Sequence, residues 1–296
     1  MRIVSTLPSA TEIVCALGLE RELVGVTHEC DYPPLVRSKP VVVRSVFDPQ
    51  KMTQAQIDQF VREYSRTRKS LYIVDEELLS RLNPDLVITQ DVCDVCATSS
   101  QVVLEALQKL NHKPEVLTLN PHTFSDVLDD ILKVGKATNT LEKAQALVRS
   151  LKTRIELVNK PKRAPSVVCL EWLDPLYNAG HWIPELVELA GGRELLGKKA
   201  QPSHRIEWKE LLEANPEHIF LTICGYDVER TLKELKALKR DWRDLQAVKL
   251  GNFYAMNGSW YFSRPGPRLV DGLVAIARFL NGEKPPESVG VRAFLS

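Results

Sequence analysis

Short runs of β-branched and aliphatic residues alternate with amphipathic helical segments along most of the chain, and this alternation limits the possible folds more than any other feature. In the first half we expect strands at residues 2–6, 23–27, 41–43, 86–89 and 115–119. Between several of them, apolar residues spaced about 3.6 apart predict helices. These helices are expected at residues 11–19, 53–64, 75–82 and 100–110. The pattern is typical of an α/β fold, in which helices cover both faces of a parallel sheet.

The segment from Thr123 to Lys162 has a different character, with almost no strand-forming residues. Gly135 and the Thr138-Asn139-Thr140 run indicate a break, followed by a helix of about 20 residues, or roughly 30 Å. The α/β pattern then resumes, with strands at 166–171, 218–222 and 252–256 and helices at 182–190, 208–214, 228–235 and 266–280. We therefore predict two doubly wound parallel-sheet lobes, at residues 1–122 and 163–296, joined by a connecting backbone helix within 123–162. An ordinary helix packed inside one large domain is the alternative.

The bulk properties exclude some classes of function. The 296 residues are 44% hydrophobic and 26% charged, which is sufficient to build two cores. The formal net charge of +1, without a basic cluster, gives no reason to expect nucleic acid or an anionic membrane as a partner. No apolar stretch approaches the roughly 18 residues that cross a bilayer. The first strand follows Met1 without a leader-like segment, so we expect a cytoplasmic protein. A periplasmic or extracellular protein whose leader has been removed is the alternative.

The segment Pro8-Ser9-Ala10-Thr11-Glu12 follows the first expected strand. Ser9 is a suitable N-cap residue, and Glu12 completes an S-x-x-E capping box. Ligands of parallel α/β sheets bind beyond the carboxyl ends of the strands. A helix N-terminus at this place therefore offers N–H groups to an anionic or carbonyl ligand.

Two motifs rich in cysteine follow other strands of the first half. His28-x-Cys30 follows residues 23–27, and Cys93-x-x-Cys96 follows residues 86–89. Three thiolates and an imidazole would form a tetrahedral zinc site, although the spacing is not that of a zinc ribbon. A reversible disulfide between Cys93 and Cys96 and simple lining of a pocket are the other interpretations. Asp91, two residues before Cys93, adds a carboxylate to the same loop.

The loops that follow the strands of the second half are rich in aromatic residues. Such side chains favour a flat platform for a large, partly apolar ligand, and hydrophobic covering of the lobe is the alternative. Arg264, held before Pro265, is suited to pair with an amide or phosphate group of a ligand. Cys224 belongs to the same group of loops. The aromatic residues are Trp172, Trp182, Tyr226, Trp260, Tyr261 and Phe262.

Familiar catalytic motifs are absent from the sequence. It contains no G-x-S-x-G elbow, no H-E-x-x-H, no P-loop and no G-x-G-x-x-G. We therefore predict a binding protein and not an enzyme. A zinc- or thiol-dependent enzyme that uses the Cys/His motifs on this scaffold is the alternative.

Three segments resemble the helical-backbone class (class III) of substrate-binding proteins of ABC importers, and within it most closely the cobalamin-binding proteins. They read RIVSTLPSATEIVCALGLERELVGVTHECDYPP, LEWLDPLYNAGHWIPELVELAGGRELL and WYFSRPGPRLVDGLVAIARFL. The resemblance extends over nearly the whole chain. It implies non-catalytic binding of a corrinoid such as cobalamin in a cleft between two lobes. Relatives in this class carry haem, ferric siderophores or metal ions, which remain alternative ligands.

The resemblance also implies ligand contacts. They are the segment from Pro8 to Glu12, Tyr32 and Phe47 in the first lobe, and Trp172, Trp260 and Arg264 in the second. Ser259 stands where the family often has an acidic residue, which puts that contact in doubt.

The Cys/His motifs are not general features of the family, so we expect them to line a variant first-lobe wall. There a thiolate or imidazole can approach the metal centre of the ligand or a separate metal ion. The full candidate set is Pro8, Ser9, Glu12, His28, Cys30, Tyr32, Phe47, Asp91, Cys93, Cys96, Trp172, Cys224, Tyr226, Trp260 and Arg264, with His28, Cys30, Cys93 and Cys96 as possible metal ligands.

The resemblance implies, in addition, docking onto an ABC permease through one acidic surface residue in each lobe, seven residues before an Asn-Pro type turn. Glu77, before Pro84, fits this pattern. The corresponding residue before Pro216 is Lys209, a reversal of charge, although Glu207 and Glu210 are close in sequence. This reversal and the missing leader lead us to expect a protein that keeps the corrinoid cleft without the transporter role.

Overall fold

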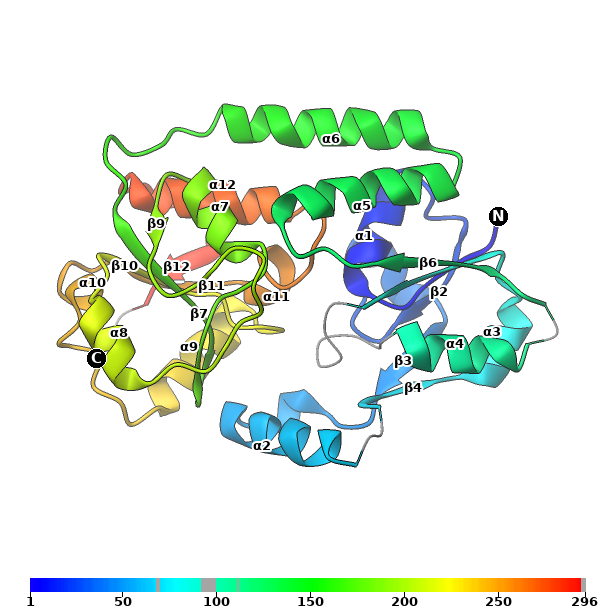
Figure 1. The fold of residues 1–296 in the computed structure, drawn as a ribbon, viewed down its shortest axis with the longest axis horizontal. Helices are drawn as coiled ribbons and strands as arrows, with labels where there is room; N and C mark the ends of the chain where they lie inside the picture. Colours follow the sequence, from blue (N-terminus) through cyan, green and yellow to red (C-terminus); the bar gives the residue numbers. More distant parts are fainter. Residues whose placement is uncertain (68–69, 92–99, 111, 294–296) are drawn as a thin grey trace. The chain divides into compact units, whose positions relative to one another are not determined.

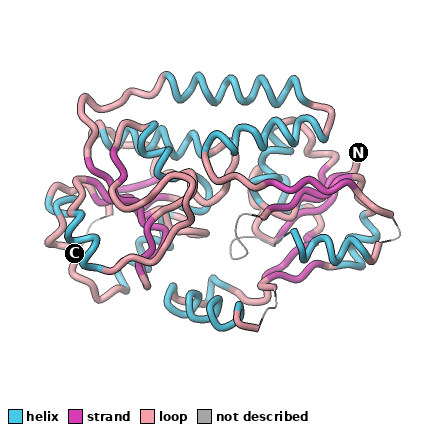
Figure 2. Tube along the Cα trace, viewed as in Figure 1, coloured by secondary structure: helices cyan, strands magenta, loops and turns pink. Residues whose placement is uncertain are grey.

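The computed structural model describes residues 1–67, 70–91, 100–110 and 112–293, and its elements follow the α/β order (Figure 1). Helices and strands alternate along most of the trace (Figure 2). The chain divides into two compact units. Unit 1 comprises Met1–Met52, Gln56–Pro121 and Ser125–Ser150, and unit 2 comprises Thr53–Ala55, His122–Phe124 and Leu151–Ser296. Each unit contains one sheet, and the predicted α/β class is confirmed.

Unit 1 is built on a six-stranded sheet in the order β4-β3-β2-β1-β5-β6. The predicted strands are present as β1 (Ile3–Ser5), β2 (Leu23–Thr27), β3 (Val41–Ser45), β5 (Leu86–Gln90) and β6 (Glu115–Leu119). Neighbouring strands among these five run parallel. The edge strand β4 (Tyr72–Val74) was not predicted and runs antiparallel to β3. Sequence order reverses at β1, which has β2 on one side and β5 on the other and so forms a topological switch point.

The helices of the first half also lie close to their predicted positions. They are α1 (Pro8–Ala16), α2 (Gln54–Ser65), α3 (Glu76–Leu82) and α4 (Ser100–Gln108), with short 3-10 turns η1 (Pro34–Ser38) and η2 (Pro49–Lys51). Valines of β1, β3 and β5 pack with apolar side chains of α3 and α4 in one core cluster. Burial of these side chains fixes which face of each helix meets the sheet.

The capping box predicted at the start of α1 does not form. Pro8 occupies the first helical turn, and the N-cap residue is Leu7, which makes no side-chain cap hydrogen bond. Proline is well suited to this position because its missing N–H is not needed there and its φ is already helical. Ser9 and Glu12 therefore lie inside the helix, buried at 2% and 4% exposure. The Ser9 prediction was wrong because the proline signal one residue earlier sets the helix start.

The segment between the two halves forms two helices, α5 (Phe124–Ala137) and α6 (Leu141–Glu156), with the expected break between them. A Cβ atom at Gly135 would lie 2.4 Å from the Cβ of Ala144, so glycine is what lets the two helices approach. α6 has 16 residues, fewer than predicted, because it ends before the Asn159-Lys160-Pro161 sequence. The role of this segment as a rigid link between lobes, and the boundaries at residues 122 and 162, remain predictions.

Unit 2 has a sheet in the order β12-β11-β10-β7-β8, with β9 paired to β7. The predicted strands β7 (Ser166–Leu173), β10 (His218–Leu221) and β11 (Phe253–Met256) form its parallel centre. The sequence did not predict β8 (Leu176–Asn178), β9 (Arg193–Glu194) or β12 (Gly290–Arg292). β8 and β12 run antiparallel to their neighbours, as β4 does in unit 1, so both sheets are mixed and not purely parallel.

The helices of unit 2 follow the same course. α7 (Ile183–Leu189), α8 (Trp208–Ala214), α9 (Val228–Ala237) and α12 (Leu269–Leu280) match predicted segments, and α10 (Gln246–Lys249) and α11 (Gly258–Tyr261) are additional single turns. α7 packs against α12. Within the described part of the chain, no helix is long and apolar enough to cross a membrane.

One local motif occurs in both units. α3 and α8 each have seven residues and end at an asparagine in the left-handed region, Asn83 with φ 41° and Asn215 with φ 36°. A proline follows each asparagine, and the chain then enters a central strand, β5 or β10. Leu79 and Leu211, four residues before each asparagine, are both buried. The two units therefore direct a short helix onto the sheet with the same turn chemistry.

Candidate ligand-binding site

The described candidate residues of unit 1 lie beyond the carboxyl ends of four neighbouring strands. Phe47 follows β3, His28 and Cys30 follow β2, Pro8 begins the helix after β1, and Asp91 follows β5. The switch point between β1 and β5 lies within this series. Ligands of open α/β sheets bind at such a point, so the topology places these residues where the sequence argument expected them.

Cys30 is held against α1. Its Sγ lies 3.1 Å from the Oγ1 atom of Thr11, and only 6% of the residue is exposed. Cys15, further along the same helix, is also buried, and desolvation is the main cause that raises the pKa of its thiol to about 12. Cys30 thus contributes to the packing between α1 and the end of β2.

His28 is exposed, and its ring is oriented by the neighbouring strand. Nδ1 lies 3.2 Å from the carbonyl oxygen of Val43 and 3.3 Å from Oγ1 of Thr27. A carbonyl oxygen only accepts, so Nδ1 donates to Val43, and in the neutral imidazole Nε2 is then the acceptor nitrogen. This tautomer gives His28 the lone pair that a metal centre or a donor group requires.

The remaining first-half candidates differ in exposure. Tyr32 is 41% exposed. Phe47 is half-buried and packs on Phe60, with ring centroids 4.7 Å apart. Asp91 is exposed, and its backbone N–H donates to the Leu119 carbonyl at 3.2 Å.

The predicted metal site depends on two residues, Cys93 and Cys96, that lie outside the described residues. The four-residue set with His28 and Cys30 therefore remains a prediction. Among residues 1–67, 70–91, 100–110 and 112–293, no group of three or more His, Cys, Asp or Glu side chains is placed to hold a metal ion.

In unit 2, residues at the end of β7 and after β10 and β11 come together in what we call the aromatic rim, which consists of Trp172, Tyr226, Ser259, Trp260, Arg264 and Arg268. The Trp172 and Tyr226 rings are 5.7 Å apart and inclined by 58°. The backbone N–H of Ser259 donates to the Tyr226 carbonyl at 2.9 Å, and Nη2 of Arg264 donates to Oγ of Ser259 at 3.3 Å. Side chains from three sequence regions are thereby joined at one end of the sheet.

Burial separates the members of the rim into two groups. Trp172 and Trp260 are half-buried, so each indole presents part of its surface. Tyr226 is 2% exposed; its hydroxyl accepts from Nη2 of Arg230 at 2.9 Å, and desolvation is the main cause that raises its pKa to about 12. Tyr226 therefore supports the Trp172 ring in this structure, and its predicted ligand contact remains a prediction.

Two functional candidates were missed by the sequence argument. Arg268 lies with its guanidinium carbon 5.2 Å from the Trp260 ring centroid, and only 8% of the residue is exposed. It belongs to the same FSRPGPR segment as Arg264, so a search for every arginine in the segment would have found it. Gln54 contacts the end of β7 from a point 118 residues earlier in the chain, and nothing in its local sequence indicates this.

The two cysteines of unit 2, Cys169 and Cys224, differ in burial. Cys224 is half-buried, and its N–H donates to the Glu171 carbonyl at 3.2 Å. Cys169 is fully buried, and desolvation is the main cause that raises the pKa of its thiol well above the ordinary value. A nucleophilic cysteine requires a lowered pKa, so the shifts at Cys15 and Cys169 oppose thiol catalysis by these two residues.

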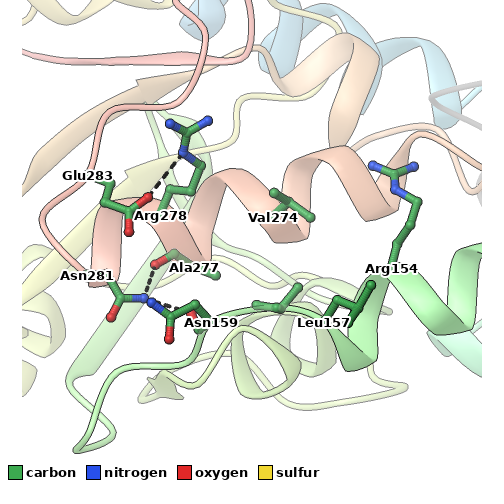
Figure 3. A pocket seen from close by; sticks show the side chains of 9 residues that line it. Arg154, Leu157, Asn159, Val274, Ala277, Arg278, Asn281 and Glu283 are labelled. Carbon is green, nitrogen blue, oxygen red and sulfur yellow. Dashed lines mark hydrogen bonds and ion pairs between the residues drawn. The ribbon is translucent and has the colours of Figure 1, made fainter.

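A separate pocket of about 280 Å³ lies in unit 2, between the end of α6 and the outer face of α12 (Figure 3). Ion pairs of Arg154 with Asp271 and of Arg278 with Glu283 lie at its border. None of the candidate ligand-binding residues lines it. The lining residues are Arg154, Leu157, Val158, Asn159, Val274, Ala277, Arg278, Asn281 and Glu283.

Three known proteins are similar to nearly the whole chain. A vitamin B12-binding protein of Vibrio cholerae is 24% identical over 292 residues, which cover 94% of this chain and 88% of the relative. An uncharacterized ABC transporter substrate-binding lipoprotein of Bacillus subtilis is 26% identical over 288 residues, covering 93% of this chain and 78% of the relative. The crystal structure of a periplasmic heme-binding protein from Pseudomonas aeruginosa has a TM-score of 0.71 at 20% identity, over 99% of this chain and 98% of that chain. This last likeness concerns the fold.

These comparisons correct the expected location. We expected a cytoplasmic protein from the sequence, but the relatives are periplasmic proteins or lipoproteins, which points to an extracytoplasmic location. The expectation was wrong because it relied on where the sequence begins. A family model described as "Periplasmic binding protein" matches residues 3–259. The chain therefore belongs to the periplasmic binding protein family.

Proposed function

We propose that the protein captures a corrinoid such as cobalamin, without catalysing a reaction on it, as the binding component of an ABC importer. The observation that carries this proposal is the aromatic rim, which combines two partly exposed indoles with two buried arginines, one of them over the Trp260 ring. The similarity to the vitamin B12-binding protein of Vibrio cholerae supports it. So does the similarity to the substrate-binding lipoprotein of Bacillus subtilis.

The chemistry of the rim suits a large ring bearing polar groups. The faces of Trp172 and Trp260 can bury the flat, apolar part of a ligand at low cost in side-chain entropy. The guanidinium of Arg264 donates several hydrogen bonds in a fixed plane, and that of Arg268 lies over the Trp260 ring. A corrinoid carries amide carbonyls and a phosphate that accept such bonds.

In unit 1 we propose that the first turn of α1 and His28 contribute to binding. The helix begins at Pro8, next to the switch point of the sheet, and its first N–H groups suit a carbonyl or phosphate oxygen. The tautomer of His28 leaves Nε2 as an acceptor that can approach the metal centre of a ligand. Tyr32, Phe47, Asp91 and the Cys93/Cys96 motif remain candidates from the sequence.

Haem is a second candidate ligand, favoured by the burial of Arg264 and Arg268 beside Trp260. The carboxylates of haem would pair with these guanidinium groups more strongly than neutral amides do. The fold likeness to a heme-binding protein agrees with this alternative.

The test of the rim is a pair of substitutions in the full chain. Trp172→Ala and Trp260→Ala should each weaken binding of cyanocobalamin in calorimetry, because each removes one indole face. The matched control is Leu250→Ala, which truncates a residue that is 54% exposed in unit 2. Unchanged affinity in both tryptophan variants would show that the ligand binds elsewhere.

We also propose a permease as the partner, with Glu77 as one docking charge. Glu77 is exposed in the first turn of α3. At the corresponding place in α8, Lys209 is exposed and lies 3.5 Å from Glu213, while Glu210 accepts the N–H of Glu207 in a capping box. Co-purification with an ABC permease from solubilised membranes should be lost in Glu77→Lys and kept in Glu63→Lys. Equal recovery of the permease by both variants would exclude Glu77 as a docking charge.

A further inference from the structure

We infer that Gln54 is a positioning residue for the aromatic rim, which holds Trp172 and the end of β7 in the arrangement that meets the ligand. This inference rests on the proposed function, since it takes Trp172 to be a ligand contact. Gln54 is the first residue of α2, and the segment Thr53–Ala55 belongs to unit 2 together with β7.

The contacts of Gln54 concentrate on three successive residues. The indole Nε1 of Trp172 donates to the main-chain oxygen of Gln54 at 3.3 Å. The backbone N–H groups of Leu173 and Asp174 donate to its side-chain Oε1 at 2.6 and 3.3 Å. One residue thus fixes the orientation of the Trp172 indole and the backbone directly after it.

The sheet explains why β7 needs such a partner. β10 ends at Leu221, which pairs with Leu170, so the last residues of β7 extend beyond their parallel neighbour. Buried backbone N–H groups require an acceptor. The carboxamide oxygen of Gln54 supplies that acceptor to Leu173, which is completely buried.

The burial of Gln54 indicates a role in geometry more than in stability. The residue is 1% exposed, although glutamine is mostly found at protein surfaces. Because both donors are backbone N–H groups, the carboxamide atom that they reach is the oxygen. Nε2 is then a buried donor without a hydrogen-bond partner in the described part of the chain. An unpaired buried donor costs free energy that offsets the bonds made by the oxygen.

The arrangement leaves Trp172 held at two points. Its Nε1 is fixed by Gln54, and its ring packs on Tyr226. A side chain that is already ordered loses less entropy when a ligand binds, so release at the Gln54 end should weaken binding even if the fold is unchanged.

Two substitutions separate the acceptor from the bulk of the side chain. Gln54→Glu keeps an oxygen in place of Oε1, and Gln54→Leu keeps similar volume without an acceptor. The matched control is Gln59→Leu on the same helix, where an exposed glutamine bonds Glu63. The readouts are the acrylamide quenching of tryptophan fluorescence in the ligand-free protein, with Trp172→Phe to identify the Trp172 contribution, and the Kd for cyanocobalamin and haemin.

We expect Gln54→Leu to increase the quenching of Trp172 fluorescence and to raise the Kd about tenfold, which is a loss of about 1.4 kcal/mol of binding free energy. Gln54→Glu should restore both values to near those of the wild type, and Gln59→Leu should change neither. Quenching and Kd of Gln54→Leu that equal those of the wild type would overturn the inference, as would equal losses in the Leu and Glu variants. If Gln54→Leu fails to fold, Gln54→Met replaces it in the same measurements. If neither variant folds, Gln54 has a purely structural role and the inference is overturned. If the wild type binds neither ligand, the proposed function fails, and the quenching result alone decides whether Gln54 positions Trp172.

Discussion

The imidazole of His218 stacks on the ring of Tyr254, with ring centroids 6.1 Å apart and planes inclined by 18°. Phe220 completes this group, at 6.3 Å from His218 and 5.2 Å from Tyr254. His218 is 7% exposed, and desolvation is the main cause that lowers its pKa to about 4. The amino ends of β10 and β11 therefore hold a histidine that the fold keeps neutral.

The first prediction concerns stability in acid. The unfolded chain protonates His218 near its ordinary pKa of 6.5, while the folded chain resists protonation until about 4. The unfolded state therefore binds more protons at this residue in this window, and the contribution of His218 to the free energy of unfolding falls as the pH drops from 6.5 to 4. We expect the loss to be on the order of 3 kcal/mol.

Urea denaturation at several pH values measures this effect. His218→Phe keeps a stacking ring without a titrating group. The free energy of unfolding of the wild type should therefore fall relative to that of the variant as the pH drops from 6.5 to 4. The neighbouring Glu217 has a pKa that is lowered to about 2, chiefly by its hydrogen bond with Arg163. Its ionisation therefore changes stability mainly below pH 4.5, and the change between pH 4.5 and 6.5 reports on His218. A difference that does not vary with pH would contradict the prediction.

The second prediction has the opposite sign and concerns Glu194. Its carboxylate accepts N–H groups of Cys169 at 3.1 Å, Leu196 at 3.2 Å and Gly197 at 3.1 Å. Desolvation nevertheless raises its pKa to about 7, from 4.5. A raised acid pKa means that the folded state holds the proton more tightly, so this contribution to stability is full below pH 4.5 and is lost as the pH rises to 7.

Glu194→Gln should remove this dependence, because the amide cannot ionise. We expect the stability of the variant relative to the wild type to increase between pH 4.5 and 7, as measured by chemical denaturation. Glu188→Gln, an exposed change on α7, is the control and should follow the wild type at every pH. Parallel curves for Glu194→Gln and the wild type would show that Glu194 ionises normally in the fold.

The third prediction concerns Gly258, the first residue of α11, which carries Trp260. A Cβ atom there would lie 2.0 Å from the carbonyl oxygen of Ile223, a backbone atom that cannot rotate away. Gly258→Ala should therefore displace α11 from the loop after β10, destabilise the protein and weaken ligand binding.

Gly282→Ala is the comparison for this change. Gly282 has φ 75° and nothing within 4 Å of the added Cβ, so it carries only the strain of a left-handed alanine, about 1 kcal/mol. Gly258→Ala should cost more than this in denaturation experiments. A cost equal to or below that of Gly282→Ala would mean that the α11 contact is easily relaxed.

The central strands of both sheets could be predicted from the sequence because each is a buried run rich in β-branched, aliphatic or aromatic residues. β4, β8, β9 and β12 were missed because they have only two or three residues, too few to show alternation. They also lie at sheet edges or outside the main strand order. The start of α1 was misplaced because a serine cap and a proline at the first turn are competing signals, and the sequence does not rank them.

The candidate site was partly predictable for a topological reason. Ligand-binding residues of α/β sheets follow the carboxyl ends of strands, so correct strands place Trp172, Cys224 and Trp260 at one end of the unit 2 sheet. Burial was not predictable, and it is what distinguishes the half-buried Trp172 from the supporting Tyr226. Gln54 was missed because its contacts are made across 118 residues or more of sequence, and no local pattern reports them.

The identity of the ligand is the central claim about this protein. The most direct measurement is equilibrium binding of the purified wild-type chain to cyanocobalamin, haemin and a ferric siderophore, by calorimetry and by quenching of tryptophan fluorescence. We predict saturable binding of cyanocobalamin, tighter than that of the other two, with a fluorescence change that is reduced in Trp172→Phe. Saturable binding of haemin or the siderophore with none of cyanocobalamin would contradict the proposed corrinoid function.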